Sequence, residues 1–267
     1  MRRRVSIRVK TSNGRSKRRY AYAKKGRRTS KRKTGRRRLR PEVKQSSATL
    51  SPTSFNSSIT PAAGDFYSIL PAVAQGTAQN QRVGSRVHPV KLVVRGYVLY
   101  NSDTLANARM LLLRMFCVED KRLRSLGTGT TSGNLIEFGG TPVTYDGSVT
   151  RHLAPANKDG FRIFYDKRHT MRKPFGYTYT GSNGATNQGA SMIEMNGSLF
   201  WPFKLVLRPG KHLPRTMTYD EAESANYPNN TNPVVAIGYA DAFNATPDTQ
   251  TTQISMSWCT TLFYTDT

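Results

Sequence analysis

Cysteine is scarce in this sequence of 267 residues, which contains only Cys117 and Cys259, each inside an apolar stretch. Two cysteines are too few for the disulfide framework of a small secreted domain. They leave two alternatives open, one bridge or two small buried thiols, and the apolar surroundings favour buried thiols. We therefore expect the protein to fold in a reducing compartment.

Long apolar runs are also missing. No stretch approaches the roughly 20 apolar residues that are needed to span a bilayer, and residues 1–7 contain no apolar segment long enough for a signal peptide. From these absences we expect a soluble, intracellular protein that does not insert into membranes.

The residue patterns of common catalytic and metal sites are absent as well. The four histidines, at positions 88, 152, 169 and 212, are scattered, and none forms a His-x-x-x-His pair. The glycine-rich residues 127–133 lack the spacing and the lysine of a P-loop. We therefore predict that the protein is not an enzyme and uses no cofactor or metal. Calcium at subunit contacts is left open, because hard cations bind clustered carboxylates, although the sequence shows no such cluster.

Acidic residues do not occur in residues 1–41, although this segment contains 20 lysines and arginines. Residues 42–267 contain the other 21 basic residues and all 16 acidic ones, so most of the net charge of +25 lies at the N-terminal end. The segment has too little apolar surface to offset the entropy of ordering, and its like charges repel one another. We predict a disordered arm over residues 1–41.

The arm is predicted to bind nucleic acid. A lysine or arginine that contacts a phosphate releases a condensed counterion, and this gain needs no base recognition. Tyr20 and Tyr22 lie among the charges, where they could stack on unpaired bases. A merely solvated or targeting tail would not need 20 basic residues without an acid. The predicted binding residues in the arm are Arg2, Arg3, Arg4, Arg8, Lys10, Arg15, Lys17, Arg18, Arg19, Lys24, Lys25, Arg27, Arg28, Lys31, Arg32, Lys33, Arg36, Arg37, Arg38 and Arg40.

Two basic clusters of the arm also fit a second use. Residues 31–33 and 36–38 are similar to nuclear localisation signals. On that interpretation host import receptors are further partners, and the protein enters the host nucleus.

The rest of the chain is predicted to contain a Ser/Thr/Pro-rich linker over residues 42–64 and one β domain over residues 65–267. In the domain, short runs of β-branched and aromatic residues alternate with Gly, Pro, Asn and Asp clusters. In residues 91–100 every second side chain is apolar, which predicts a strand with one buried and one polar face. The inward residues would be Leu92, Val94, Val98 and Tyr100, and the outward ones Lys91, Arg95 and Tyr97.

Further strands are predicted at residues 109–118, 161–169, 199–208, 234–239 and 254–264. In the first of them Leu111, Leu113, Met115 and Cys117 should share one face, with Arg114 on the opposite face. In residues 199–208, Phe203 and Leu205 should face inward and Lys204 outward. No apolar period of 3.6 residues persists for three turns, so we expect little helix. A short helix within residues 119–126 or 218–225 is the exception that we consider.

A second basic series leads into the first clear strand. Its members are Arg82, Arg86, Lys91 and Arg95. If this strand faces the same side as the arm, the four residues would extend the phosphate-binding surface. The alternative, ordinary polar-face residues or subunit salt bridges, fits the sequence equally well.

The string AQGTAQNQRVGSRVHPVKLVVRGYVLY at residues 74–100 follows the arm and the Ser/Thr/Pro segment. In this layout the chain resembles the capsid proteins of small circular Rep-encoding single-stranded DNA (CRESS-DNA) viruses, above all their satellite-tobacco-necrosis-virus-like coat group. In that family a QGT…RVG segment precedes the first strand of a jelly roll. The matching residues here are Gln75, Gly76, Thr77, Arg82, Val83 and Gly84. Residues 161–167 and 235–241 are also similar to the family.

The resemblance implies an all-β fold, a single eight-stranded antiparallel jelly roll made of two sheets. It also implies that identical subunits, about 60 of them, form a closed icosahedral shell with the arm inside. The expected function is therefore that of a virion structural protein that packages single-stranded DNA. Phosphate contacts do not distinguish DNA from RNA, and the resemblance favours DNA. The alternatives are the coat protein of a single-stranded RNA satellite-like virus and a non-viral basic nucleic-acid-binding protein with a β domain.

Overall fold

The computed structural model describes residues 42–61, 64–100, 110–123, 133–172, 199–220, 226–243, 246–247 and 254–266, and the backbone alone at 176–177 and 192–193. The chain divides after Arg40 into two units, and all of the described residues belong to the second. The predicted disorder of residues 1–41 and the 20 basic residues of the arm therefore lie outside the described residues.

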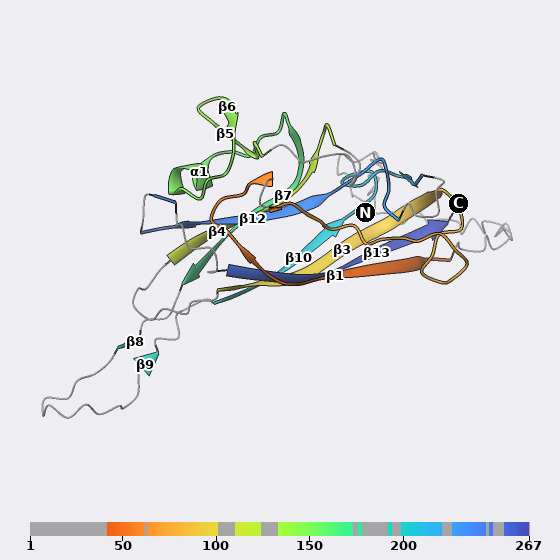
Figure 1. The fold of residues 1–267 in the computed structure, drawn as a ribbon, viewed down its shortest axis with the longest axis horizontal. Coiled ribbons are helices and arrows are strands. Elements are labelled where there is room, and N and C mark those ends of the chain that lie inside the picture. Colours follow the sequence, from red (N-terminus) through yellow and green to blue (C-terminus); the bar gives the residue numbers. More distant parts are fainter. Residues whose placement is uncertain are drawn as a thin grey trace, which may run out of the picture. The chain divides into compact units, whose positions relative to one another are not determined.

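The second unit is all-β, with one short helix (Figure 1). The elements are β1 (Lys44–Phe55), β2 (Tyr67–Ser68), β3 (Arg86–Tyr100), β4 (Met110–Asp120), β5 (Ile136–Phe138), β6 (Thr141–Val143), α1 (Val149–Leu153), β7 (Phe161–Arg172), β8 (Gly176–Tyr177), β9 (Met192–Ile193), β10 (Phe200–Leu207), β11 (Met217–Thr218), β12 (Val234–Asp241) and β13 (Ile254–Asp266).

Two antiparallel sheets form the body of this unit. The first has the strand order β1-β13-β3-β10, and β11 also pairs with β3. The second has the order β2-β12-β4-β7. Two short hairpins, β5-β6 and β8-β9, make up the remaining strand pairs that the structure describes.

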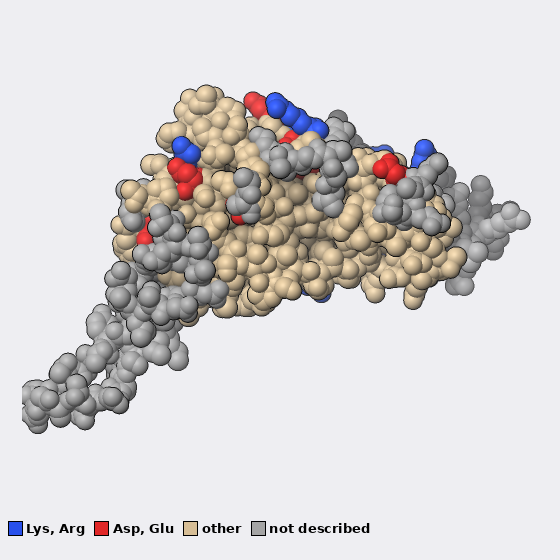
Figure 2. Space-filling view, in the orientation of Figure 1, with Lys and Arg blue, Asp and Glu red and all other residues tan. Residues whose placement is uncertain are grey.

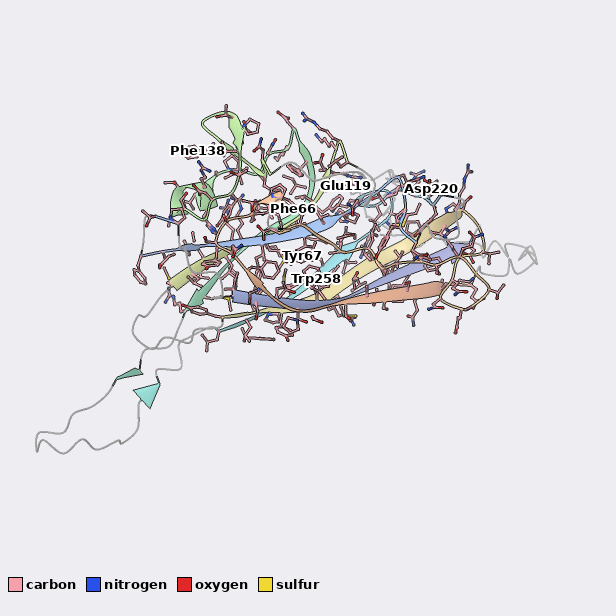
Figure 3. The ribbon with its side chains drawn as sticks, in the orientation of Figure 1. Phe66, Tyr67, Glu119, Phe138, Asp220 and Trp258 are labelled. Carbon is pink, nitrogen blue, oxygen red and sulfur yellow. The ribbon has the colours of Figure 1, made fainter. Side chains whose placement is uncertain are left out.

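The main core lies between the two sheets. Leu92, Val94 and Val98 of β3 are fully buried in it together with side chains of β4, β10 and β12. In Figure 3, Tyr67 of β2 and Trp258 of β13 face one another across this core, with ring centroids 5.8 Å apart. The predicted alternation in residues 91–100 is confirmed, because its apolar positions are buried and Lys91 and Arg95 are exposed.

Gly96 interrupts the apolar face of β3 for a steric reason. It is paired with Trp258 of β13 and Phe203 of β10. A Cβ atom at Gly96 would come within 2.7 Å of the Trp258 Cβ and within 2.6 Å of the Phe203 ring. Both aromatic side chains therefore fill the space that a side chain at position 96 would need.

A second core covers the opposite face of β4 and β12. Phe116 and Val118 of β4 are fully buried there against residues of the segment 133–160, which includes β5, β6 and α1. Both faces of β4 and β12 are therefore covered by apolar side chains. The strand β4 consequently has no polar outer face, unlike β3.

The prediction that Arg114 lies opposite Leu113 and Met115 is confirmed, but that face of β4 is covered, and the Arg114 side chain is fully buried there. Its Nε and Nη2 atoms donate to the carboxylate of Asp166 on β7, at 2.9 and 2.7 Å. Its Nη1 atom donates to the carbonyl oxygens of His152 and Ala154 at 2.9 and 2.7 Å. The guanidinium thus joins two strands of the sheet to the end of α1.

One further prediction was wrong, and another falls partly outside the described residues. The linker assigned to residues 42–64 was wrong for Lys44–Phe55, which form β1 and pair with β13 along most of its length. The helix considered within 119–126 or 218–225 does not appear in the described part of either range, since residues 119–120 belong to β4 and residue 218 to β11. The helix that is present, α1, begins after Ser148, whose hydroxyl accepts from the Arg151 amide.

Within the described residues, the structure has no helix with the length and apolar character needed to cross a membrane.

Replacement of Arg114 by methionine should destabilise the unit by about 3 kcal/mol, because it leaves Asp166 without its partner and buried carbonyl oxygens without donors. Urea unfolding of the full chain measures this loss. Arg162→Met is the matched control: the Arg162 side chain is 42% exposed and its nitrogen lies 3.6 Å from Glu119, so we expect a loss below about 1 kcal/mol. Equal losses for the two variants would contradict the role given to Arg114.

His152 should make stability fall in mild acid. Burial, followed by the nearby Arg114 and Arg168, lowers the pKa of His152 from 6.5 to about 4. The unfolded chain therefore binds a proton at a higher pH than the folded chain does. The stabilisation is complete above pH 6.5 and is lost as the pH falls towards 4.

Between pH 7 and pH 4.5, His152 should account for a loss of roughly 2–3 kcal/mol. Denaturant unfolding at the two pH values should show a smaller loss for His152→Gln than for the natural chain, by about that difference. An identical pH dependence in both proteins would show that His152 is not the titrating group.

Candidate nucleic-acid interface

The side of the five-stranded sheet that faces away from the core has several basic residues. Arg86, Lys91 and Arg95 of β3 and Lys204 of β10 are all exposed there. We call this surface the basic face and define it by these four residues together with Tyr97, Phe200, Phe263 and Cys259. Its members come from three strands that are far apart in the sequence.

A β-bulge brings Arg86 to the same side as Arg95. If the side chains of β3 alternated without interruption, Arg86 would lie on the core side with Leu92, because both positions are even-numbered. The pairing with β13 shifts by one residue between Phe263 and Tyr264, which pair with Lys91 and Pro89. Such an extra residue reverses the side on which the preceding residues lie. Arg86 is therefore exposed and Val87 buried.

Strand pairing places a second cation beside Arg95. Lys204 of β10 is directly paired with Arg95, and Cys259 of β13 is paired with Arg95 on its other side. Directly paired residues in an antiparallel sheet have Cβ atoms about 5 Å apart. Two positive charges therefore lie next to each other near the middle of the basic face, which raises the local attraction for an anion.

Carboxylates are nearly absent from the five-stranded sheet. Among the described residues of its strands the only one is Asp266, at the end of β13, and its carboxylate lies 2.7 Å from the Lys44 ammonium. The four-stranded sheet, in contrast, includes Glu119, Asp120, Asp166 and Asp241. In the orientation of Figure 2, acidic side chains appear on the upper part and at the left end of the sandwich, and none is visible among the described residues along the lower edge, where β1 and β13 run.

Aromatic rings lie among the cations of the basic face. The Lys91 ammonium is 4.5 Å from the centroid of the Phe263 ring. Tyr97 and Phe200 are stacked, with centroids 5.4 Å apart and planes inclined by 30°. The Phe200 residue is 51% exposed. Basic and aromatic side chains together are the combination that binds single-stranded nucleic acids.

The predicted basic series is only partly brought together. Arg86, Lys91 and Arg95 share the basic face, but Arg82 does not, because it is fully buried. The Arg82 Nη1 atom donates to the Gly84 carbonyl at 2.7 Å, and its guanidinium lies over the Tyr219 ring. The assignment of Arg82 to a phosphate-binding surface was therefore wrong.

The structure gives the QGT…RVG segment a local role. The Gly76 amide donates to the Arg82 carbonyl and the Arg82 amide to the Ala74 carbonyl, both at 2.9 Å. The segment thus closes a loop through backbone hydrogen bonds at Arg82, whose side chain is buried. It also does not precede the first strand, because β1 and β2 come before it.

Sequence reasoning missed Lys204 and the aromatic members of the basic face. The alternation in residues 199–208 did predict that Lys204 points outward and Phe203 and Leu205 inward, and this is confirmed. What the sequence does not contain is the pairing of β10 with β3, which connects residues more than 100 positions apart. Without that pairing, Lys204 could not be placed beside Arg95.

The histidines have separate surroundings. His169 stacks on Trp201, with centroids 4.8 Å apart, His212 lies against Phe164 and Tyr165, and His152 contacts the Tyr145 hydroxyl. Among the residues that the structure describes, no three His, Cys, Asp or Glu side chains come together as a metal site.

Comparison with protein-family models finds no match to this chain, and comparison with curated proteins finds no significant relative.

The two cysteines differ in accessibility, and both are free thiols. The prediction of two buried thiols was right for Cys117 and wrong for Cys259, which is exposed on the basic face. Burial, with a smaller effect of Glu119, raises the pKa of the Cys117 thiol far above its ordinary value. The thiolate is the reactive form, so Cys117 should be inert in the folded chain.

We therefore expect iodoacetamide to modify Cys259 in the native protein at least about tenfold faster than Cys117. Peptide mass spectrometry after timed alkylation measures both rates, and unfolding in urea should make them similar. Rapid native labelling of Cys117 would mean that β4 does not stay buried.

Proposed function

We propose that this protein is a viral capsid protein that assembles into a small icosahedral shell and packages a single-stranded DNA genome through its basic N-terminal arm. The observation that carries the proposal is the combination of two parts in one chain. An arm with 20 basic residues and no acidic one is joined to an antiparallel two-sheet β unit.

The order of the strands supports an eight-stranded jelly roll. The eight strands of the two sheets in chain order are β1, β2, β3, β4, β7, β10, β12 and β13. The first pairs with the eighth, the second with the seventh, the third with the sixth and the fourth with the fifth. This is the pairing of one long hairpin folded into two sheets, as expected for two linked Greek keys.

Jelly rolls serve several functions, so the fold alone does not select one. Capsid proteins, lectins and cupins all use it. The arm favours the capsid function among these, because its charge matches a polyanion and not a neutral sugar or a small substrate. About 60 subunits would bring on the order of 1,200 arm charges to the interior, a number on the scale of a small single-stranded genome.

Exposed apolar side chains are available for contacts between subunits. Phe138 at the end of β5 is 48% exposed, and Leu153 at the end of α1 is 65% exposed. Both belong to the segment that covers the four-stranded sheet, and Figure 3 shows Phe138 at its projecting end. Apolar residues on a projecting surface are suited to a protein interface.

Deletion of residues 1–40 tests the proposal. Light scattering should show particles of megadalton mass both with and without the arm, because the β unit makes the subunit contacts. The absorbance ratio at 260 and 280 nm should fall from that of a nucleoprotein to that of protein alone, because the truncated chain lacks about half of its positive charge.

A chain with residues 2–40 in shuffled order is the matched control. It should still package nucleic acid, because phosphate contacts depend on charge and not on order. A normal nucleic-acid content in the truncated particles would refute the role of the arm. A full-length chain that stays at its single-chain mass of 29.8 kDa would refute shell formation and favour a solitary nucleic-acid-binding protein.

A further inference from the structure

The basic face presents charged and aromatic groups at several outward positions along β3, with Val93 between Lys91 and Arg95. Lys91 with Phe263 lies at one position, Arg95 with Lys204 follows, and Tyr97 with Phe200 comes next. From Lys91 to Tyr97 the strand rises on the order of 20 Å. That length is suited to several nucleotides of an extended single strand.

We propose that the basic face is a second nucleic-acid site, separate from the arm, and that it binds unpaired bases. Phe200 and Tyr97 stack on a base, while Arg95 and Lys204 contact the phosphates on either side of it. The proposal deepens the proposed function, and it rests on that function only for the source of the single strand that reaches the site.

Stacking makes the site selective for single strands. Every unpaired base offers a π-face, and stacking on an aromatic side chain is therefore tolerant of sequence. In a duplex the faces of all internal bases are already covered by their neighbours. The exposed ring of Phe200 can consequently gain a contact from single-stranded DNA that a duplex cannot give it.

The charge of the face argues against a second copy of this chain as its occupant. Among the described residues of these strands, the exposed cations Lys91, Arg95 and Lys204 have no carboxylate beside them on the outward side, since Asp266 lies at the end of β13 and is paired with Lys44. Two such faces brought together would repel each other. A polyanion removes this repulsion and also supplies rings for stacking.

The start of β1 lies beside one end of the basic face. Gln45, the second residue of β1, pairs with Phe263, which pairs in turn with Lys91. The polypeptide therefore enters the sheet within two residues of the Lys91–Phe263 contact.

Two substitutions in the full-length chain separate stacking from charge. Phe200→Ser should weaken binding of unassembled subunits to oligothymidylate by at least about fivefold. It should leave both the affinity for a duplex of equal length and the salt dependence unchanged. Lys204→Gln should weaken binding to both DNAs and lower the slope of log affinity against log salt by about 1.

Phe243→Ser is the matched control. Phe243 is 74% exposed and follows β12, outside the basic face, and its replacement should leave both affinities unchanged. Fluorescence anisotropy at fixed salt gives the affinities, and far-ultraviolet circular dichroism checks that each variant is folded. In the natural chain, oligothymidylate should also slow alkylation of Cys259 by at least about threefold, because bound DNA covers the thiol beside Arg95.

Equal binding of oligothymidylate by the natural chain and by Phe200→Ser, with no protection of Cys259, would overturn the proposal. That result would leave the proposed function untouched if the same chain forms nucleic-acid-filled particles. Conversely, if Phe200→Ser weakens single-strand binding but the natural chain never assembles, the second site is supported and shell formation is refuted. The two failures are therefore distinguishable.

Discussion

The register of β3 is the constraint on which both the core and the basic face depend. This strand lies between β13 and β10, so its inward residues meet the four-stranded sheet while its outward residues meet solvent. A slip of one residue would expose Leu92 and Val94 and bury Arg95 without a partner, at a cost of several kcal/mol. Burial of the core thus fixes which charges the outer surface presents. The bulge before Lys91 then adds Arg86 to the same surface.

Alternation in the sequence was sufficient where a strand has one buried and one open face. It predicted the two faces of β3 and of β10 correctly, because solvent lies on one side of each. It also assigned Arg114 of β4 to the correct side, but it did not show that this outer face is covered by residues 133–160. Arg114 appears in the sequence as an ordinary outward cation, and only the covering segment supplies the carbonyl oxygens that accept its hydrogen bonds. A local pattern has no information about such a distant cover.

Two other errors have the same origin in non-local contacts. The Ser- and Thr-rich residues 44–55 have few apolar side chains, so they were assigned to a linker, yet their backbone pairs with β13 at a sequence distance of about 200 residues. Arg82 belongs by spacing to a basic series, but a closed loop and the ring of Tyr219 bury it. In both cases the partner residue, and not the segment itself, decides the structure. The candidate site was also incomplete in the sequence, because Lys204 and Phe263 join it only through the pairing of β10 and β13 with β3.

The outer faces of the two sheets differ, and this difference affects assembly. In the four-stranded sheet the outer face of β4 and β12 is buried beneath chain segments on which Phe138 and Leu153 are exposed. The five-stranded sheet leaves its outer face uncovered and basic. In the proposed shell, subunits with a charge of +25 repel one another until a polyanion reduces that repulsion. Apolar contacts made on one side of the sandwich are therefore strengthened by nucleic acid bound on the other, so that filling and closing the shell favour each other.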